Sequence, residues 1–421
     1  MTLNFIKNTV LFFVLVLISC GSGNKQDSKS KKQNTASIKA AANNRSIIVG
    51  ANQTDIYLPK LKGKNVGVVA NQTSVIFKDV STTQISRNDH YTHLVDSLIA
   101  LDINISKVFA PEHGFRGQAD AGEHIVDGAD TKTGLPIFSL YGKNKKPTAA
   151  QLQNIDIMVF DIQDVGARFY TYISTLHYIM EACAENKIPL LILDRPNPNG
   201  HYIDGPILEP KHKSFVGMHP VPVVHGMTIG EYAQMINGEH WLKNGSQCKL
   251  TVVPVKNYTH QTSYSLPIKP SPNLPNDTAI NLYPSLCFFE GTNISVGRGT
   301  DMQFQVIGSP FLSMHSFAFT PMSNVGAKHP KYEGRSCYGI DLRRTPPLNS
   351  LNLHWLLELY NLNQHSVPHD AFFNRFFTKL AGTETLQKQI EAGWSEAEIK
   401  ASWQDGLNAF KKMRKQYLIY P

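Results

Sequence analysis

The chain has 421 residues, of which 42% are hydrophobic and 18% charged, so it is long enough for two or three globular domains. Its formal net charge of +8 is concentrated at the N-terminus, where residues 1–45 carry seven basic residues against one acidic residue, a net +6. The +2 left for the rest of the chain excludes the strongly basic surface that nucleic-acid-binding proteins use. We therefore expect no nucleic-acid partner.

The first 20 residues have the pattern of an export signal. Lys7 precedes the apolar run "TVLFFVLVLI", which is too short to span a bilayer and ends in "LISC". This segment resembles a lipoprotein signal peptide, with lipidation at Cys20; a plain signal peptide or an uncleaved anchor is the alternative. Residues 21–45 are polar and read as a flexible tether. The sequence thus predicts a lipid-anchored protein of the cell envelope that faces the periplasm.

Strands and helices alternate in the next part of the chain. Short apolar runs bounded by turn residues predict strands at 65–71, 105–110, 156–161, 188–193 and 249–255. Helical periodicity separates them at 90–102, 173–187 and 226–242, and Thr228 with Glu231 fits a capping box. We therefore expect a Rossmann-like, mostly parallel sheet with helices on both faces.

The C-terminal part is less periodic. Proline and asparagine accumulate at 265–285, which indicates a boundary or a rigid connection. Helices are expected near 350–360, 370–381, 384–392 and 395–414. The predicted organisation is a signal peptide at 1–20, a tether at 21–45, a catalytic domain at 46–270 and a smaller α+β domain at 271–421 that closes a cleft.

Polar residues directly follow three of the predicted strands. Ligands of open parallel sheets bind beyond the carboxyl ends of the strands, so these residues are expected to share one pocket. The three segments are Pro111-Glu112-His113-Gly114, then Asp161 to Tyr170 with Gln163 and Arg168, and then Asp194-Arg195-Pro196-Asn197.

Glu112 is the strongest candidate for acid/base catalysis, because it follows a strand directly and Pro111 and Gly114 restrict its turn. His113 is a candidate catalytic partner, and a satisfied structural histidine is the alternative. Asp161 and Asp194 are equally explained as caps of the following loops or helices. Arg168 and Arg195 indicate an anionic ligand or a carboxylate partner.

"FFEGTNISVGRGT" (288–300) is a second dense segment, and Glu290 and Arg298 are its candidate site residues. "GRGT" lacks the spacing of a phosphate-binding P-loop, and the first predicted strand is not followed by a GxGxxG fingerprint. We therefore expect no nucleotide or dinucleotide cofactor.

Six segments occur in the order "APEHGFRG", "DIQDVGARFYTYISTL", "LDRPNPNG", "HGMTIGEYA", "PSPNLP" and "FEGTNISVGRGT". Together they resemble the NamZ-type exo-β-N-acetylmuramidases of bacterial peptidoglycan recycling, over about residues 47–421. The resemblance implies a glycosidase that removes N-acetylmuramic acid from the non-reducing end of peptidoglycan fragments. It also implies a Rossmann-like domain, a smaller C-terminal domain and a cleft between them. The glutamates of "PEHG" and "FEGTN" correspond to Glu112 and Glu290.

The candidate residues fit this chemistry. Glycoside hydrolysis needs an acid and a carboxylate or an assisting substrate group, and Glu112, Glu290 and Glu123 carry carboxyl groups. Selecting muramic acid requires a cation for its lactyl carboxylate, which Arg168, Arg195 or Arg298 would supply through a bidentate contact. Stacking on sugar faces is expected from aromatic side chains. These are Tyr170, Tyr172 and Phe289. The remaining substrate-binding candidates are Asp161, Gln163 and Asn197.

Two other readings remain open. A non-catalytic lipoprotein that captures muropeptides would have the same domains, cleft and tether. A metal-dependent hydrolase would use the acidic and histidine residues of the "PEHG" loop, but their spacing matches no standard zinc motif, and we expect no metal. Those residues are His113, Asp120, Glu123, His124 and Asp127.

Overall fold

The computed structural model describes residues 46–78, 90–117, 127–312, 316–364 and 371–421. They belong to one compact unit, Ser46–Pro421. The predicted signal peptide and tether, and candidates Asp120, Glu123 and His124, lie outside the described residues.

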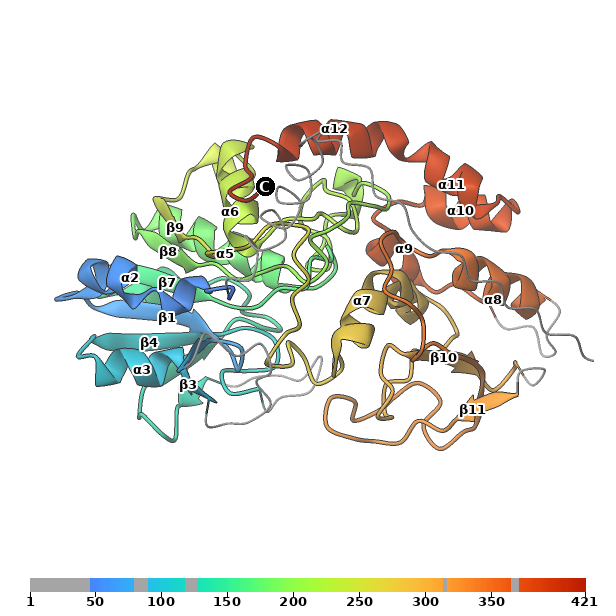
Figure 1. Ribbon diagram of the computed structural model, residues 1–421, viewed down its shortest axis with the longest axis horizontal. Coiled ribbons are helices and arrows are strands. Elements are labelled where there is room, and N and C mark those ends of the chain that lie inside the picture. Colours follow the sequence, from blue (N-terminus) through green and yellow to red (C-terminus); the bar gives the residue numbers. More distant parts are fainter. Residues whose placement is uncertain (1–45, 79–89, 118–126, 313–315, 365–370) are drawn as a thin grey trace, which may run out of the picture. The chain divides into compact units, whose positions relative to one another are not determined.

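A seven-stranded sheet is the centre of the first part of the unit (Figure 1). All neighbouring strands pair in parallel except β5, which is antiparallel to β6 at one edge. The predicted mostly parallel α/β sheet is therefore confirmed. In spatial order the strands are β5 (Gly128–Ala129), β6 (Pro136–Ser139), β4 (Ile105–Ala110), β1 (Val66–Ala70), β7 (Ile157–Asp161), β8 (Leu190–Leu193) and β9 (Leu250–Val253).

Helices cover both faces of this sheet, which is why its strands read as continuous apolar runs. Val68 belongs to the apolar cluster that contains residues of α2 (Thr54–Leu61) and α3 (Leu94–Ala100). Its neighbour Val69 belongs to the cluster that contains α5 (Tyr172–Glu185) and α6 (Ile229–Gly238). Successive side chains of a strand point to opposite faces, so each strand contributes to both layers of the core.

Two local predictions in this part are confirmed. The Thr228 hydroxyl accepts a hydrogen bond from the backbone of Glu231, and the Glu231 carboxylate accepts one from the backbone of Thr228, so the capping box begins α6. The periodicity at 173–187 corresponds to α5. The helix expected at 90–102 is shorter, because its first residues form β3 (Tyr91–His93), which pairs with β2 (Val75–Phe77).

The second part of the unit contains a small antiparallel sheet and most of the remaining helices. The sheet has the order β10 (Val306–Ser309), β12 (Cys337–Asp341) and β11 (Phe317–Phe319). The helices are α7 (Asp277–Leu286), η5 (Cys287–Gly291), α8 (His354–Gln364), α9 (Arg375–Ala381), α10 (Thr385–Glu391), α11 (Glu396–Ser402) and α12 (Gln404–Arg414). Shorter elements elsewhere are η1 (Gly50–Asn52), α4 (Ala149–Leu152), η3 (Pro210–His212) and η4 (Lys243–Gly245).

Residues 265–285 are not a connection over their whole length, because α7 begins at Asp277. Pro284 lies inside the helix and has no N–H to donate to the carbonyl of Ile280. The side-chain amide of Asn199 donates to that carbonyl instead, at 3.0 Å. A residue 81 positions away thus makes the bond that the proline removes. The single helix expected at 395–414 is also wrong, because it divides at Trp403 into α11 and α12.

The C-terminus returns to the central sheet, where it lies beside α6 (Figure 1). The Tyr420 hydroxyl donates to the buried carboxylate of Asp194 at 2.6 Å and accepts from the backbone of Val255 at 2.8 Å. The backbone N–H groups of Ile419 and Tyr420 donate to Glu231. The last residues therefore complete the hydrogen bonds of the α/β layer, at the ends of β8 and β9.

Candidate active site

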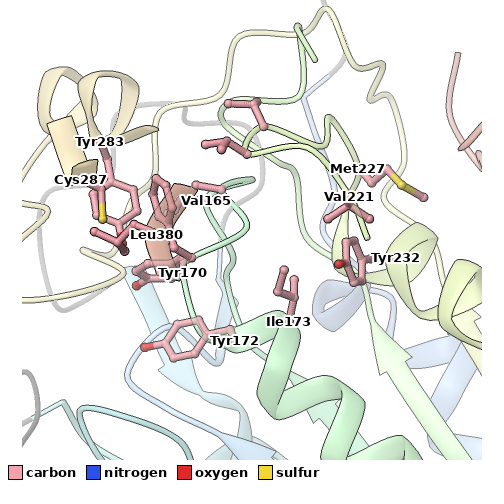
Figure 2. Packing of buried hydrophobic residues seen from close by; sticks show 14 of the residues in the cluster. Val165, Tyr170, Tyr172, Ile173, Val221, Met227, Tyr232, Tyr283, Cys287 and Leu380 are labelled. Atoms are coloured by element: carbon pink, nitrogen blue, oxygen red, sulfur yellow. The ribbon is translucent and has the colours of Figure 1, made fainter. Parts of the chain in front are cut away.

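A pocket beyond the carboxyl ends of the central strands brings together residues from several segments. Sequence-predicted members are Glu112, His113, Tyr170, Glu290 and Arg298. The residues that sequence reasoning missed are Tyr141, Phe169, Thr171, Phe215, Val216, Ser271, Asn273, Leu274, Tyr283, Cys287, Phe304, Phe376 and Leu380. Figure 2 shows Tyr283 of α7 and Cys287, the first residue of η5, close to Tyr170 and Leu380. Ser271 and Asn273 lie in the "PSPNLP" motif, which was a signal that these positions matter.

Glu112 lies in a tight turn that begins directly after β4. The backbone of Gly114 donates to the carbonyl of Pro111 at 3.0 Å, and His113 and Gly114 have φ of 74° and 79°. A non-glycine residue rarely adopts a positive φ, so the turn holds His113 in a strained conformation. The turn leaves Glu112 partly exposed in the pocket while His113 is buried.

Two hydroxyl groups lie beside the Glu112 carboxyl group. Thr171 lies at the start of α5 and donates from Oγ1 to Oε2 of Glu112 at 2.9 Å, and its hydroxyl does not cap the helix. The Tyr141 phenol lines the pocket beside Glu112, close enough to feel the charge of its carboxylate. Burial, and then the charge of Glu112, hold the pKa of Tyr141 well above its ordinary value, so the phenol keeps its proton. Glu112 is thus fixed in orientation by neutral groups.

An ion-pair cluster anchors the loop that follows Glu112. Arg116 donates to Asp130 at 2.8 and 2.7 Å and also pairs with Asp96 at 3.1 Å. The Arg116 guanidinium holds the pKa of Asp130 well below its ordinary value. Phe115 is buried against His93, with ring centroids 4.8 Å apart. The density of charges in this stretch is therefore partly explained by structural pairing.

Glu290 and Arg298 form a bidentate ion pair in the pocket. Arg298 donates from Nε and Nη2 to the two carboxylate oxygens at 2.6 and 2.9 Å. Each side chain is about a quarter exposed, 25% and 23%, so both reach the pocket. The guanidinium group also lies over the Phe304 ring, 5.1 Å from its centroid. The fork fixes the orientation of the Glu290 carboxylate in the pocket.

Lys331 supports the loop that carries Glu290. Its ammonium group donates to the carbonyls of Phe289, Thr292 and Ile294 at 3.4, 2.5 and 2.9 Å. Burial lowers the pKa of Lys331 to about 8. The position lies outside the motifs seen in the sequence, and only the fold brings it beneath Glu290.

Arg168 and Arg195, which we expected to bind an anionic ligand or a carboxylate of the protein, both have partners within the fold. Arg168 is fully buried, and its guanidinium donates to four backbone carbonyls. These belong to Pro206, Val221, Leu380 and Ala381. Arg195 pairs with buried Asp161 at 2.6 and 2.9 Å and donates to the carbonyl of Val75. Both cations hold segments of the fold together, and neither lines the pocket.

Asp161, Gln163 and Asn197 are also structural. Asp161 is the partner of Arg195, and the Gln163 amide donates to the carbonyls of Asp164 and Pro196. The Asn197 amide donates to the carbonyl of Met227 and accepts from the backbone of Asn199. Their hydrogen bonds hold the loops that follow β7 and β8.

Of the aromatic residues expected to stack on sugars, some line the pocket and others are buried in the fold. Tyr170 lines the pocket and donates to the carbonyl of Pro270 at 2.8 Å. Tyr172 is buried beside it and accepts a hydrogen bond from the amide of Asn71, while Phe289 is fully buried in the core. Only Tyr170 of the three is therefore placed to contact a ligand.

Within the described ranges, no group of three or more histidine, cysteine, aspartate or glutamate side chains is arranged to hold a metal ion. Asp127, one of the residues considered for such a site, accepts a hydrogen bond from the backbone of Ser139 at 2.8 Å. The part of the chain that the structure describes also lacks a helix long and apolar enough to cross a bilayer.

The chain matches two family models. The first is described as the N-terminal part of the exo-beta-N-acetylmuramidase NamZ and matches residues 66–278. The second is described as its C-terminal part and matches residues 281–420. The chain is also 40% identical over 388 residues to the peptidoglycan beta-N-acetylmuramidase NamZ of Bacillus subtilis (strain 168), which covers 86% of this chain and 89% of that protein.

Two crystal structures of DUF1343 family proteins from Bacteroides fragilis have the same fold. The first is 46% identical to this chain, with a TM-score of 0.79. The second is 28% identical, with a TM-score of 0.73. Each comparison covers 89% of this chain and 99% of the other.

Proposed function

This chain belongs to the exo-β-N-acetylmuramidase NamZ family, and we propose that it is a glycosidase that releases N-acetylmuramic acid from the non-reducing end of peptidoglycan fragments. The family indicated by the sequence motifs is thereby confirmed. The observation that carries the proposal is that one pocket contains both Glu112 and the Glu290–Arg298 pair. Two carboxyl groups with different surroundings can perform different steps of glycoside hydrolysis.

Glu112 is the general acid in this proposal. Thr171 donates to Oε2 and so helps to orient the carboxyl group that protonates the leaving glycosidic oxygen. A hydroxyl group can donate to or accept from a carboxyl group, whereas the guanidinium group beside Glu290 can only donate. His113, buried at the same turn, has a positioning role for Glu112.

Glu290 is the opposing carboxylate. Held in a fixed orientation by Arg298, it can stabilise positive charge on the sugar ring or orient water. Arg298 uses Nε and Nη2 for Glu290, and its Nη1 has no hydrogen-bond partner among the described residues. We assign Nη1 to the lactyl carboxylate of muramic acid, as a single contact in place of the bidentate contact expected from the sequence.

The N-terminal segment completes the proposal. The apolar run ending in "LISC" and the polar residues 21–45 support a lipid anchor at Cys20. Such an anchor would hold the enzyme at a membrane of the cell envelope, facing the periplasm. We also retain a division into a Rossmann-like catalytic domain at 46–270 and a C-terminal domain at 271–421.

A chromogenic β-glycoside of N-acetylmuramic acid tests the activity. Purified protein should release the chromophore, and it should act more slowly on the matching N-acetylglucosaminide, which lacks the lactyl group. With muropeptides of defined length, free N-acetylmuramic acid should be the first sugar released. Saturable binding without any hydrolysis would instead identify a muropeptide-binding lipoprotein.

A further inference from the structure

Three partly exposed aromatic side chains form a strip that begins at Glu112. They are Tyr141, Phe215 and Tyr178, and we call them the aromatic strip. The ring centroids of Tyr141 and Phe215 are 6.3 Å apart, and those of Phe215 and Tyr178 are also 6.3 Å apart. Tyr141 and Phe215 line the pocket, and Tyr178 continues the strip onto α5.

Phe215 is held rigidly at the tip of a turn. Ser214 and Gly217 exchange two backbone hydrogen bonds, at 2.8 and 3.1 Å, which places Phe215 and Val216 between them. The carbonyl of Phe215 also accepts from the hydroxyl of Ser174 on α5 at 2.7 Å. A ring fixed in this way offers contact area to a ligand with little further loss of conformational entropy.

Lysine side chains lie next to the aromatic strip. The ammonium group of Lys145 lies 4.8 Å from the centroid of the Phe215 ring. Two more lysines are exposed close by in the sequence: Lys143 is two residues after Tyr141, and Lys213 is two residues before Phe215. The acidic residues nearby on α5 are already engaged, because Glu181 and Glu185 both pair with Lys146 at 2.7 Å. The strip therefore presents apolar rings next to lysines that can meet an anion.

The position of the acid decides which part of a substrate would reach this strip. A general acid contacts the glycosidic oxygen, so the leaving sugar lies on its side of the pocket. In the proposed function, Arg298 and Glu290 hold the released sugar in the same pocket. Because Tyr141 lies beside Glu112 in the pocket, the strip begins where the leaving part of the chain begins.

On the basis of the proposed function, we propose that the aromatic strip and Lys143, Lys145 and Lys213 bind the leaving part of the substrate, and that this part is an anionic oligosaccharide. The leaving sugar packs its apolar face on Tyr141 and Phe215. The lysines attract the carboxylates of the peptide on the following muramic acid, whose own lactyl carboxyl group is an amide. The preferred substrates are therefore muropeptides of three or more sugars that carry acidic stems.

The test compares substrates that share the released sugar and differ in the leaving group. One is the chromogenic glycoside, and the other is a muropeptide with an acidic stem. Phe215→Ala should reduce kcat/KM for the muropeptide about tenfold and leave the chromogenic substrate within about twofold. The paired variant Lys143→Ala with Lys145→Ala should lose about fivefold on the acidic muropeptide and nothing on the same muropeptide with its peptide carboxylates amidated.

Lys249→Ala is the matched control, because this exposed lysine precedes β9 at the opposite edge of the sheet. Equal losses on both substrates, or unchanged kinetics of every strip variant on the muropeptide, would overturn the leaving-group site. Hydrolysis of the chromogenic substrate by the unaltered enzyme tests the proposed glycosidase activity alone. A failure of the leaving-group site can therefore be told apart from a failure of the proposed activity.

Discussion

Arg298 donates two hydrogen bonds to Glu290, at 2.6 and 2.9 Å, in the same pocket that contains Glu112. Glu112 instead meets the hydroxyl groups of Thr171 and Tyr141. The two glutamates therefore have opposite surroundings, one cationic and one neutral. This difference in partners suits the two glutamates to different steps of the reaction.

The first prediction concerns the preference for muramic acid. Arg298→Ala should reduce kcat/KM for the muramic acid glycoside by about 2–4 kcal/mol in transition-state binding, because a charged partner is left unpaired. The glucosaminide should lose less, so the ratio of the two rates should fall. Glu290→Gln is the matched variant and should lower both rates in proportion. An unchanged ratio in Arg298→Ala would exclude Arg298 from recognition of the lactyl group.

Glu112→Gln keeps the shape of the side chain and removes its acid function. The turnover number should fall by about 10²–10⁴-fold, while the dissociation constant for the substrate stays nearly unchanged. Thermal unfolding should show a folded protein, since Gln can still accept from Thr171. A folded variant with near-normal kcat would remove Glu112 from the mechanism.

Asp130 should make the loop around Glu112 sensitive to acid. Arg116 depresses the pKa of Asp130 in the folded protein, so this ion pair stabilises the fold fully above the ordinary aspartate pKa of about 4. The contribution is lost as the pH falls below that value towards the depressed pKa. Asp130→Asn should therefore be less stable than the parent protein at pH 7, and the gap should narrow as the pH falls. Chemical denaturation at several pH values measures this; a constant gap contradicts it.

Tyr420 should contribute to the stability of the central sheet. Tyr420→Phe leaves the backbone N–H of Val255 without its acceptor and removes one donor from buried Asp194, which should cost about 1–3 kcal/mol. Tyr417→Phe is the control, because its hydroxyl contacts the side chain of Glu239 in a more open position. Equal midpoints of unfolding for the two variants would show that the C-terminal contact is not stabilising.

Cys20 should carry the lipid. Metabolic labelling with a fatty-acid analogue should mark the full-length protein, and Cys20→Ala should abolish the label and release the protein from the membrane fraction. Equal labelling of the variant would exclude Cys20 as the anchor. Activity towards the soluble chromogenic substrate should be the same in both, because the anchor precedes the compact unit.

The sequence alone was sufficient for features that depend on neighbouring residues. The runs that became β1, β4, β7 and β8 are apolar because both faces of the sheet are covered, and each run ends where polar residues begin. The capping box at Thr228 depends on a spacing of three residues. The motifs containing Glu112 and Glu290 were also visible. Periodicity, caps and short motifs are local signals, so they can be read without knowing the fold.

The tertiary structure decided which polar residues face the pocket and which face the protein. The sequence does not distinguish Arg298 from Arg168, because the four carbonyls that satisfy Arg168 come from positions 206, 221, 380 and 381. Tyr141 and Phe215 lie in segments without regular periodicity, and only the turn at Ser214 and Gly217 directs Phe215 to the pocket. A buried polar group needs a partner, but the chain can supply that partner from any distance in sequence. Folding therefore determines whether the partner is internal or a ligand.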